Sequence, residues 1–172
     1  LHTWNHGLFK GLLFLAAGAT IHAARPRVID KMGGLGCRMP WTAACFLVGA
    51  VAICGLPPLN GFVSELLTYL GLFGALAADG ALAPLAAIAI TVLAAVGAMA
   101  LLCFVKVFGV VYLGAPRSAA KQHADDGGPA LRAPMIALAL ACAVLGAVPL
   151  CVVPALQTVI DAWPAPNSTP AR

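Results

Sequence analysis

Charge is the scarcest property of this 172-residue chain. Charged residues make up 9% of it, against roughly 25% in ordinary soluble domains. Aromatic residues make up only 7%, whereas hydrophobic residues reach 62%. Six acidic and ten basic side chains cannot cover a water-soluble globule of this length, and so apolar a chain is not intrinsically disordered. The composition therefore predicts a membrane protein and excludes a soluble enzyme.

Cofactor and nucleic-acid motifs are also missing. The sequence has no haem, iron–sulphur or nucleotide-binding motif, so we expect no cofactor in this chain. Its six cysteines form no C-x-x-C pair and lie mostly in apolar runs, which is typical of small core residues and not of a disulfide or metal framework. The net charge of +4 is not gathered into one basic patch, so we expect no nucleic-acid partner.

Four apolar stretches are long enough to cross a bilayer, which takes about 20 residues. They cover residues 4–22, 40–77, 84–113 and 134–162. Pro40, Pro84 and Pro134 stand where a helix would begin, because the first helical position needs no backbone donor. Pro149 and Pro154 should kink the last stretch. The sequence predicts an all-α bundle of about four crossings, forming one membrane domain over residues 1–172.

The stretch 40–77 is too long for one straight helix, and its middle carries the sequence GLPPLNG. Two prolines and two glycines interrupt the helical hydrogen bonds there; the residues concerned are Gly55, Pro57, Pro58, Asn60 and Gly61. Either two spans meet at a tight turn, or one crossing consists of two half-helices. The flanking segments 23–39 and 114–133 are basic, whereas the connection around Asp79 has no Lys or Arg. The positive-inside rule therefore favours one broken crossing.

Glu65 is the only glutamate in the chain, and it follows the interruption in apolar surroundings. A carboxylate in hydrocarbon costs at least ~2.5 kcal/mol on insertion scales, so an intramembrane acid is a functional-site hypothesis. The alternative interpretation is that Glu65 caps the first turn of the second half-helix, where the helix dipole favours an anion. The two interpretations are compatible.

His2, His6 and Lys10 follow one another at intervals of four residues, which places them on one face of a helix. Histidine titrates near neutral pH, and a lysine removed from water releases its proton more readily, so the three form a candidate proton relay. The alternatives are structural histidines and a lysine that reaches the membrane surface. Metal binding by the histidines is disfavoured because no carboxylate or thiolate lies nearby in sequence.

Other ionisable residues lie further along the chain. Lys106 is set in an apolar run and is a candidate for proton exit or, equally, for reaching the membrane surface. His123, Asp125 and Asp126 lie in a loop bounded by glycine and proline, and we expect them to be solvated. The chain also begins at Leu1 directly in a helical pattern, which suggests that an upstream part shares the function.

Several motifs make the sequence similar to a known family. They are Asn5–Leu15 (NHGLFKGLLFL), Gly33–Leu35, Met39–Thr42 and Gly55–Glu65 (GLPPLNGFVSE). With its His-Lys helix and its broken helix bearing an ionisable group, the chain resembles the antiporter-like, proton-translocating membrane subunits. These occur in respiratory complex I, cation/proton antiporters and membrane-bound hydrogenases. Phe104–Gly109 and Leu113–Ser118 are most similar to the hydrogenase-4 and formate hydrogenlyase branch.

The resemblance implies roles for individual residues. Family members contain two inverted repeats with a broken helix each, and this chain resembles only their C-terminal part. Lys10 would match the central relay lysine, His2 and His6 the histidines beside it, and Glu65 the terminal station of the channel. The glutamate–lysine pair of the first repeat has no counterpart, so this chain by itself should lack a complete pathway.

Two functions of different class remain open. The first is an ion-translocating, non-catalytic subunit of a redox-driven complex, either a membrane-bound hydrogenase or an NADH dehydrogenase-like complex. Sodium/proton exchange is a variant of it. The second is a structural anchor for a peripheral hydrogenase. Buried charge at three depths favours transport, because a scaffold would lose stability without a functional gain. The expected partners are other membrane subunits, a peripheral redox arm, the lipid of a bacterial inner membrane, and protons or sodium.

Overall fold

The computed structural model describes residues 1–24, 28–29, 32–78, 80–115 and 124–162. Over these residues the chain is helical and contains no strand. The helices are α1 (His2–Ala24), α2 (Pro40–Ile53), α3 (Asn60–Ala77), α4 (Ala83–Val111), α5 (Pro129–Ala147) and α6 (Val153–Asp161), with 3-10 turns η2 (Leu35–Cys37) and η4 (Pro149–Val152). The predicted all-α fold is therefore confirmed.

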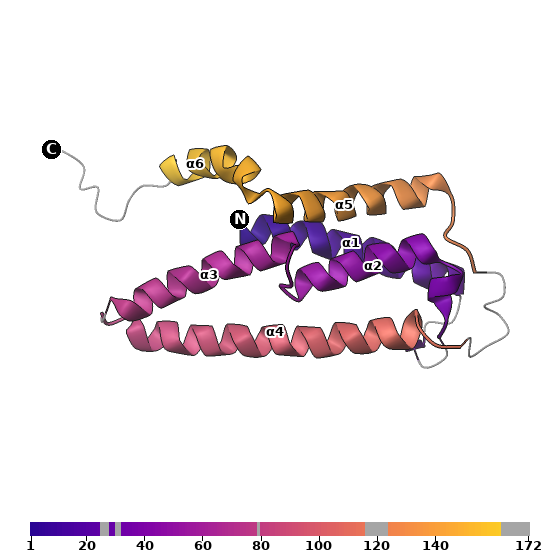
Figure 1. Cartoon of the computed structure of the whole chain (residues 1–172), viewed down its shortest axis with the longest axis horizontal. Helices are drawn as coiled ribbons and strands as arrows, with labels where there is room; N and C mark the ends of the chain where they lie inside the picture. Colours follow the sequence, from indigo (N-terminus) through magenta and orange to yellow (C-terminus); the bar gives the residue numbers. More distant parts are fainter. Residues whose placement is uncertain (25–27, 30–31, 79, 116–123, 163–172) are drawn as a thin grey trace.

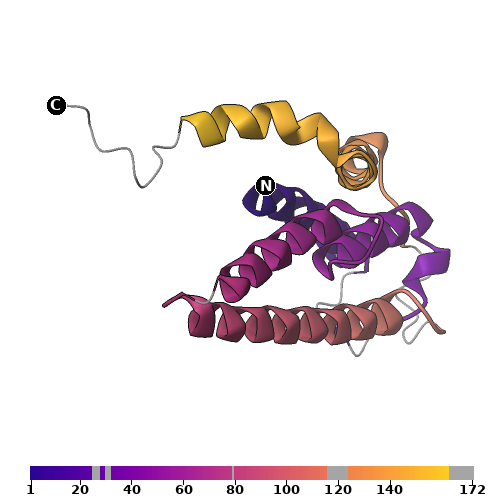
Figure 2. The same cartoon turned by 60° about the vertical axis from the view of Figure 1, so that its left-hand side comes forward.

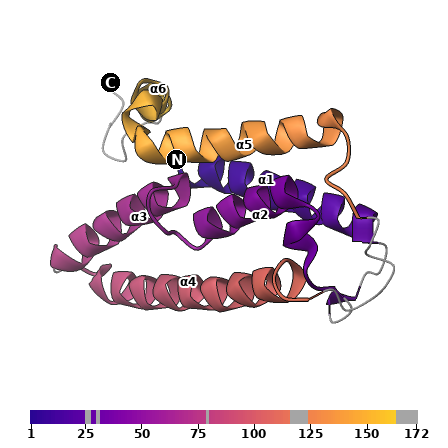
Figure 3. The ribbon, with the colours of Figure 1, turned by 45° about the vertical axis from the view of Figure 1, so that its right-hand side comes forward.

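The helices pack in layers, with α4 and α5 on opposite sides of α2 and α3 (Figures 1 and 3). α1 lies between α5 and α2 and packs against both. The core forms mainly where α1 and α2 meet. Its most buried large apolar side chains are Phe9, Leu12, Leu35, Met39 and Met135. Figure 2 shows that α6 continues from the end of α5 and points away from this core.

The predicted interruption is present between α2 and α3. α2 ends at Ile53 and α3 begins at Asn60, and the two helices follow each other along the molecule while α4 runs back beside both (Figure 1). At Gly61, a methyl group would overlap the carbonyl oxygen of Ala52. Glycine at this position therefore lets the second helix begin against the last turn of the first.

Proline marks two of the three predicted helix starts. Pro40 opens α2, and Pro84 stands in the first turn of α4, as expected. Pro134 instead lies inside α5, so this expected start is wrong. The helix begins earlier, at Pro129, whose missing N–H suits the first position equally well. The predicted kink is present, because α5 ends at Ala147 and the turn at Pro149 separates it from α6.

The segments that follow α1 and α4 meet at one end of the bundle. The backbone N–H of Gly34 donates to the carbonyl of Leu113, and that of Gly36 donates to the carbonyl of Tyr112, each at 2.9 Å. The connection between α3 and α4 lies at the opposite end (Figure 1). Most basic residues used for the topology prediction lie outside the described part: Arg25, Arg27, Lys31, Arg117 and Lys121.

Asp126 provides a cap for α2 from a distant part of the chain. Its carboxylate accepts hydrogen bonds from the backbone N–H groups of Trp41 at 3.1 Å and Thr42 at 2.9 Å. The side chain is 4% exposed, so the expectation that Asp126 is solvated is wrong. The reason is that a helix N-terminus offers unpaired N–H groups and a favourable dipole to an anion. Asp125 is exposed as expected, and His123 lies outside the described residues.

Three helices are long and apolar enough to cross a membrane: α1, α4 and α5. α2 is a shorter apolar helix. α4 is the least buried of the three, and its exposed large side chains are Leu85, Ile88, Val92, Val96, Met99, Leu101, Leu102 and Val105. In water such a surface would be unstable, so α4 must face lipid or other protein.

Candidate proton-relay site

The histidine column predicted on the first helix forms at the beginning of α1. The ring centroids of His2 and His6 are 5.8 Å apart, and His6 packs edge-on against Phe9 at 5.2 Å. His6 interacts electrostatically with both His2 and Lys10. His2 and Lys10 are exposed, whereas His6 is half-buried. The three side chains therefore follow one another in the expected order.

A hydrogen bond joins this column to α3. Nδ1 of His2 lies 3.0 Å from Oγ of Ser64, which is 2% exposed. The Ser64 hydroxyl also lies 3.0 Å from the carbonyl oxygen of Gly61, in its own helix. When its single proton points to that carbonyl, Nδ1 of His2 must be the donor. The histidine column thus ends at the residue that precedes Glu65.

Glu65 folds back across the interruption between α2 and α3. The side chain is half-buried, and a methyl group placed on Gly55 would overlap its carboxylate. It also interacts electrostatically with His2 and with Cys54. The structure does not support the alternative that Glu65 caps α3, because no acidic residue lies in the first turn and no side chain caps the helix.

The two candidate lysines occupy different places. Lys10 borders a cavity of about 220 Å³ between α1, α2 and α4; the other lining residues are Leu13, Phe14, Ala17, Phe46, Ile53 and Phe104. Lys106 is exposed on α4, and it shares no hydrogen bond or ring contact with the histidine column in the described part of the chain. The structure therefore places His2 beside His6 and near Glu65, with Lys10 close enough to His6 for an electrostatic interaction, whereas Lys106 has no interaction of this kind with the column in the described part of the chain.

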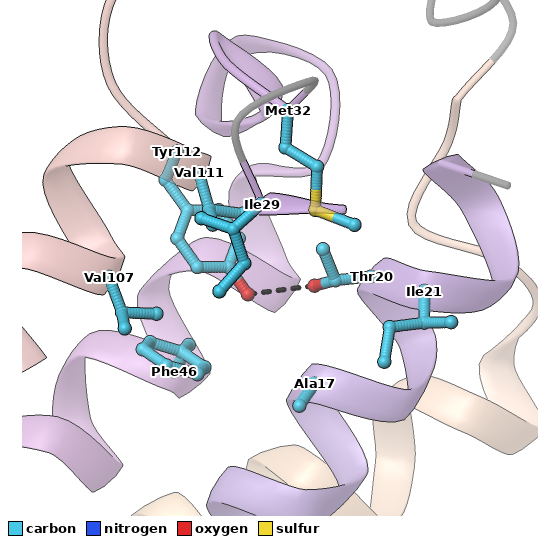
Figure 4. Close-up of a pocket in the computed structure, with 9 residues that line it drawn as sticks. All are labelled: Ala17, Thr20, Ile21, Ile29, Met32, Phe46, Val107, Val111 and Tyr112. Carbon is cyan, nitrogen blue, oxygen red and sulfur yellow. Dashed lines mark hydrogen bonds between the residues drawn. The ribbon is translucent and has the colours of Figure 1, made fainter. Parts of the chain in front are cut away.

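A second cavity, of about 210 Å³, lies further along α1, toward the end where the loops meet (Figure 4). Oγ1 of Thr20 and the hydroxyl of Tyr112 form a 2.7 Å hydrogen bond across it. Ala17 and Phe46 border this cavity and also the cavity beside Lys10. The two spaces therefore adjoin along the same side of α1.

Sequence reasoning missed Asn5 and Ser64 beside the column, and it assigned Asn60 only to the helix interruption. Asn5, Ser64 and the side chain of Asn60 are all buried at the junction of α1 and α3. Nδ2 of Asn5 donates to the backbone carbonyl of Asn60 at 2.9 Å. An available signal was the polarity of Asn5 within an apolar helix, directly beside His6. The pairing itself joins residues 55 positions apart and was not visible in the sequence.

The chemistry available at this site is proton transfer. No cluster of three or more His, Cys, Asp or Glu that could hold a metal occurs within the described residues. Five cysteines are present as free thiols: Cys37, Cys45, Cys54, Cys103 and Cys142. The groups that meet at the junction of α1 and α3 are imidazole, hydroxyl and carboxylate. Imidazole and carboxylate can bind and release a proton, and a hydroxyl can both donate and accept a hydrogen bond between them.

The family comparison identifies the architecture. Residues 1–91 match the family described as NADH:quinone oxidoreductase/Mrp antiporter, transmembrane. This chain belongs to that family. The NADH:quinone oxidoreductase/Mrp antiporter family consists of membrane proteins, so the chain is a multi-pass membrane protein and the predicted resemblance is confirmed.

Individual relatives point to the same family. Hydrogenase-4 component B of Escherichia coli is 44% identical over 145 residues, which cover 84% of this chain and 22% of that protein. Formate hydrogenlyase subunit 3 of the same organism is 38% identical and covers 98% of this chain. A chain of the Mrp complex from Dietzia superposes with a TM-score of 0.64 at 25% identity, covering 86% of this chain and 34% of that one.

The chain spans only 22% and 28% of the length of these two Escherichia coli relatives. Its helices therefore match one part of these longer relatives.

Proposed function

We propose that this chain is the C-terminal part of a proton-translocating subunit in a redox-driven complex of the bacterial inner membrane. Its similarity to hydrogenase-4 component B and formate hydrogenlyase subunit 3 favours a membrane-bound hydrogenase. The observation that carries the proposal is the hydrogen bond between His2 and Ser64, because it links the histidine column of α1 to the helix that bears Glu65.

The proposed path runs from Lys10 along α1 to His2 and then across Ser64 to Glu65. A proton on Lys10 passes to His6, one helical turn away, and then to His2, whose ring lies beside that of His6. From His2 it crosses the Ser64 hydroxyl and reaches the Glu65 carboxylate beside the interruption. A helix broken at membrane depth is stable where its freed backbone groups face protein or water, and in transporters such breaks mark ion sites.

The proposal assigns no redox chemistry to this chain. Other membrane subunits and a peripheral redox arm would supply the driving reaction. The upstream part of the subunit would complete the path toward Lys10, since the chain covers only about a quarter of its relatives.

The test compares three variants in the full-length subunit within its complex: Lys10→Met, Glu65→Gln and the double variant. Gln keeps the size and shape of Glu but has no titratable proton, and Met keeps the length of Lys without its charge. If one proton passes both residues in series, each single variant should stop proton flux in vesicles, and the double variant should be little worse. Thr91→Val, on the exposed face of α4, serves as a control that should leave flux unchanged.

Three results would contradict the proposal. Unchanged flux in Glu65→Gln would remove Glu65 from the path. Partial losses that multiply in the double variant would mean that the two residues act independently. A wild-type complex that assembles and is redox-active but moves no protons would favour the structural-anchor function.

A further inference from the structure

An apolar groove of about 230 Å³ lies between α2 and α5, away from the histidine column. α2 lines it from Trp41 to Val48 and α5 from Ile136 to Ala143, so each side is about 10 Å long at ~1.5 Å per residue. Trp41 is 53% exposed and Leu140 is 60% exposed. The groove therefore opens to the outside of the bundle and not toward its core.

Arg132 stands at one end of this groove. It precedes Ile136 by one helical turn, so the two residues lie on the same face of α5. Its Nε atom is buried and has no hydrogen-bond partner, and no ion pair with Arg132 occurs in the part of the chain that the structure describes. An arginine guanidinium is always charged and carries five N–H donors. The groove therefore ends at an unpaired cation.

Trp41 stands at the same end of the groove, on the α2 side. Asp126 joins the starts of the two helices, because its carboxylate accepts the backbone N–H of Trp41 at 3.1 Å and α5 begins three residues later, at Pro129. Both helices run from this end of the bundle (Figure 1). Tryptophan is enriched at the membrane–water interface, where its apolar ring and its N–H face different surroundings.

The two acidic residues before α5 do not neutralise Arg132. The Asp126 carboxylate is 4% exposed and bonds to the first N–H groups of α2. The Asp125 carboxylate is exposed and accepts the backbone N–H of Gly127 at 2.9 Å. The site thus combines a free cation at the level of the helix starts with an apolar channel below it.

We propose that the groove between α2 and α5 binds an acyl chain of an anionic phospholipid, and that the lipid phosphate contacts the Arg132 guanidinium beside the Trp41 ring. Guanidinium and phosphate form strong, charge-assisted hydrogen bonds, often in pairs. Basic pockets between transmembrane helices are typical sites for anionic head groups. A protein helix in the groove would cover Arg132 and would need an acid at that level, whereas a phospholipid carries its charge at the end of its apolar chains.

The first experiment measures lipid binding to the full-length subunit within its complex. The delipidated complex in detergent is titrated with dioleoyl phosphatidylglycerol, which is anionic, or with dioleoyl phosphatidylcholine, which is zwitterionic, and bound lipid is counted by native mass spectrometry. Wild type should bind one phosphatidylglycerol more than Arg132→Gln, or bind it about fivefold or more tightly. Arg38→Gln is the matched control, because Arg38 is exposed and does not line the groove. It removes the same charge and should leave binding at this site unchanged.

The second experiment fills the groove and keeps the charge. Ala143→Phe places a ring where the acyl chain would lie, so the same phosphatidylglycerol should be lost although Arg132 is intact. Ala137→Phe, at an exposed position of α5 outside the groove, is the control and should bind lipid as wild type does. Loss in Ala143→Phe but not in Ala137→Phe separates filling of the groove from a general effect of a larger side chain.

Four results would overturn the lipid site. They are equal binding of the two lipids by wild type, unchanged binding in Arg132→Gln, displacement of the lipid by millimolar inorganic phosphate, and a structure of the complex with a protein helix seated in the groove. The inference does not rest on the proposed function, because neither Arg132 nor the groove belongs to the proton path. Proton flux in Glu65→Gln therefore tests the one, and phosphatidylglycerol binding in Arg132→Gln tests the other.

Discussion

Gly55 combines two structural requirements in one residue. Its φ is +63°, a conformation that side chains rarely adopt, and the Glu65 carboxylate occupies the space where a methyl group would project. This glycine, two residues before the first of the two prolines, thus also leaves room for the side chain of the proposed terminal proton acceptor. Sequence reasoning placed Gly55 in the interruption but had no means to connect it with Glu65.

Gly55→Ala should therefore affect both stability and transport. The left-handed conformation costs an alanine about 1–2 kcal/mol, and the new methyl group must displace the Glu65 carboxylate. We expect a lower unfolding temperature in detergent and reduced proton flux in vesicles. Gly71→Ala, on α3 with nothing within 4 Å of the added methyl group, is the control and should stabilise the helix slightly. Equal behaviour of the two variants would refute the assigned role of Gly55.

The polar residues show where prediction from sequence ended. The rings of His2 and His6 lie side by side as the spacing of four residues predicts, because helical spacing is a local property of the chain. Asp126 was misread because its partners, Trp41 and Thr42, lie in another part of the sequence. A loop flanked by glycine and proline gives no indication that one of its carboxylates is buried.

At the scale of elements, the Asp126 cap on α2 should contribute measurably to the free energy of unfolding. Replacing a capping residue by alanine typically costs about 1 kcal/mol, and up to about 2 kcal/mol at buried sites. Asp126→Ala leaves the N–H groups of Trp41 and Thr42 without their acceptor, so we expect a loss of this size in the free energy of unfolding. Asp125→Ala is the control, because that carboxylate is exposed and accepts a local hydrogen bond from the backbone N–H of Gly127. If Asp126→Ala lost no more unfolding free energy than Asp125→Ala, the cap would be unimportant.

The helix boundaries were predictable in part. Proline in the first turn marked the starts of α2 and α4, and the GLPPLNG motif marked the interruption between α2 and α3. The start of α5 was misplaced because Pro129 and Pro134 both fit a first helical position, and only the fold decides between them. Hydrogen bonds between elements, such as that of Thr20 with Tyr112, had no signal in the sequence.

At the scale of the whole molecule, the positions of the loops support a single crossing for α2 and α3 together. Gly34 and Gly36 bond to Leu113 and Tyr112, so the segments after α1 and α4 lie at the same end of the bundle. If α2 and α3 each crossed the membrane, these two segments would be on opposite sides. A single crossing would place both predicted basic segments on the same side of the membrane, as the positive-inside rule expects.

Cysteine labelling in intact cells tests this topology. Gly80→Cys, in the exposed connection between α3 and α4, should react with an impermeant thiol reagent from the periplasmic side. The native Cys37 is exposed at the opposite end and should react only after the cytoplasmic side is opened. Labelling of residue 80 from the cytoplasmic side alone would mean that α2 and α3 form two crossings.

The cap on α2 also has a consequence for the order in which the chain is made. Thr42 and Asp126 are 84 positions apart, so the ribosome finishes α2, α3 and α4 before it adds the carboxylate that closes the start of α2. Proteins generally fold from the N-terminus during synthesis, but here the first turn of the broken crossing must wait for the segment beyond α4. The newly inserted α2 can therefore pack against α1 first. Its N-terminal turn is capped only after Asp126 has been synthesised.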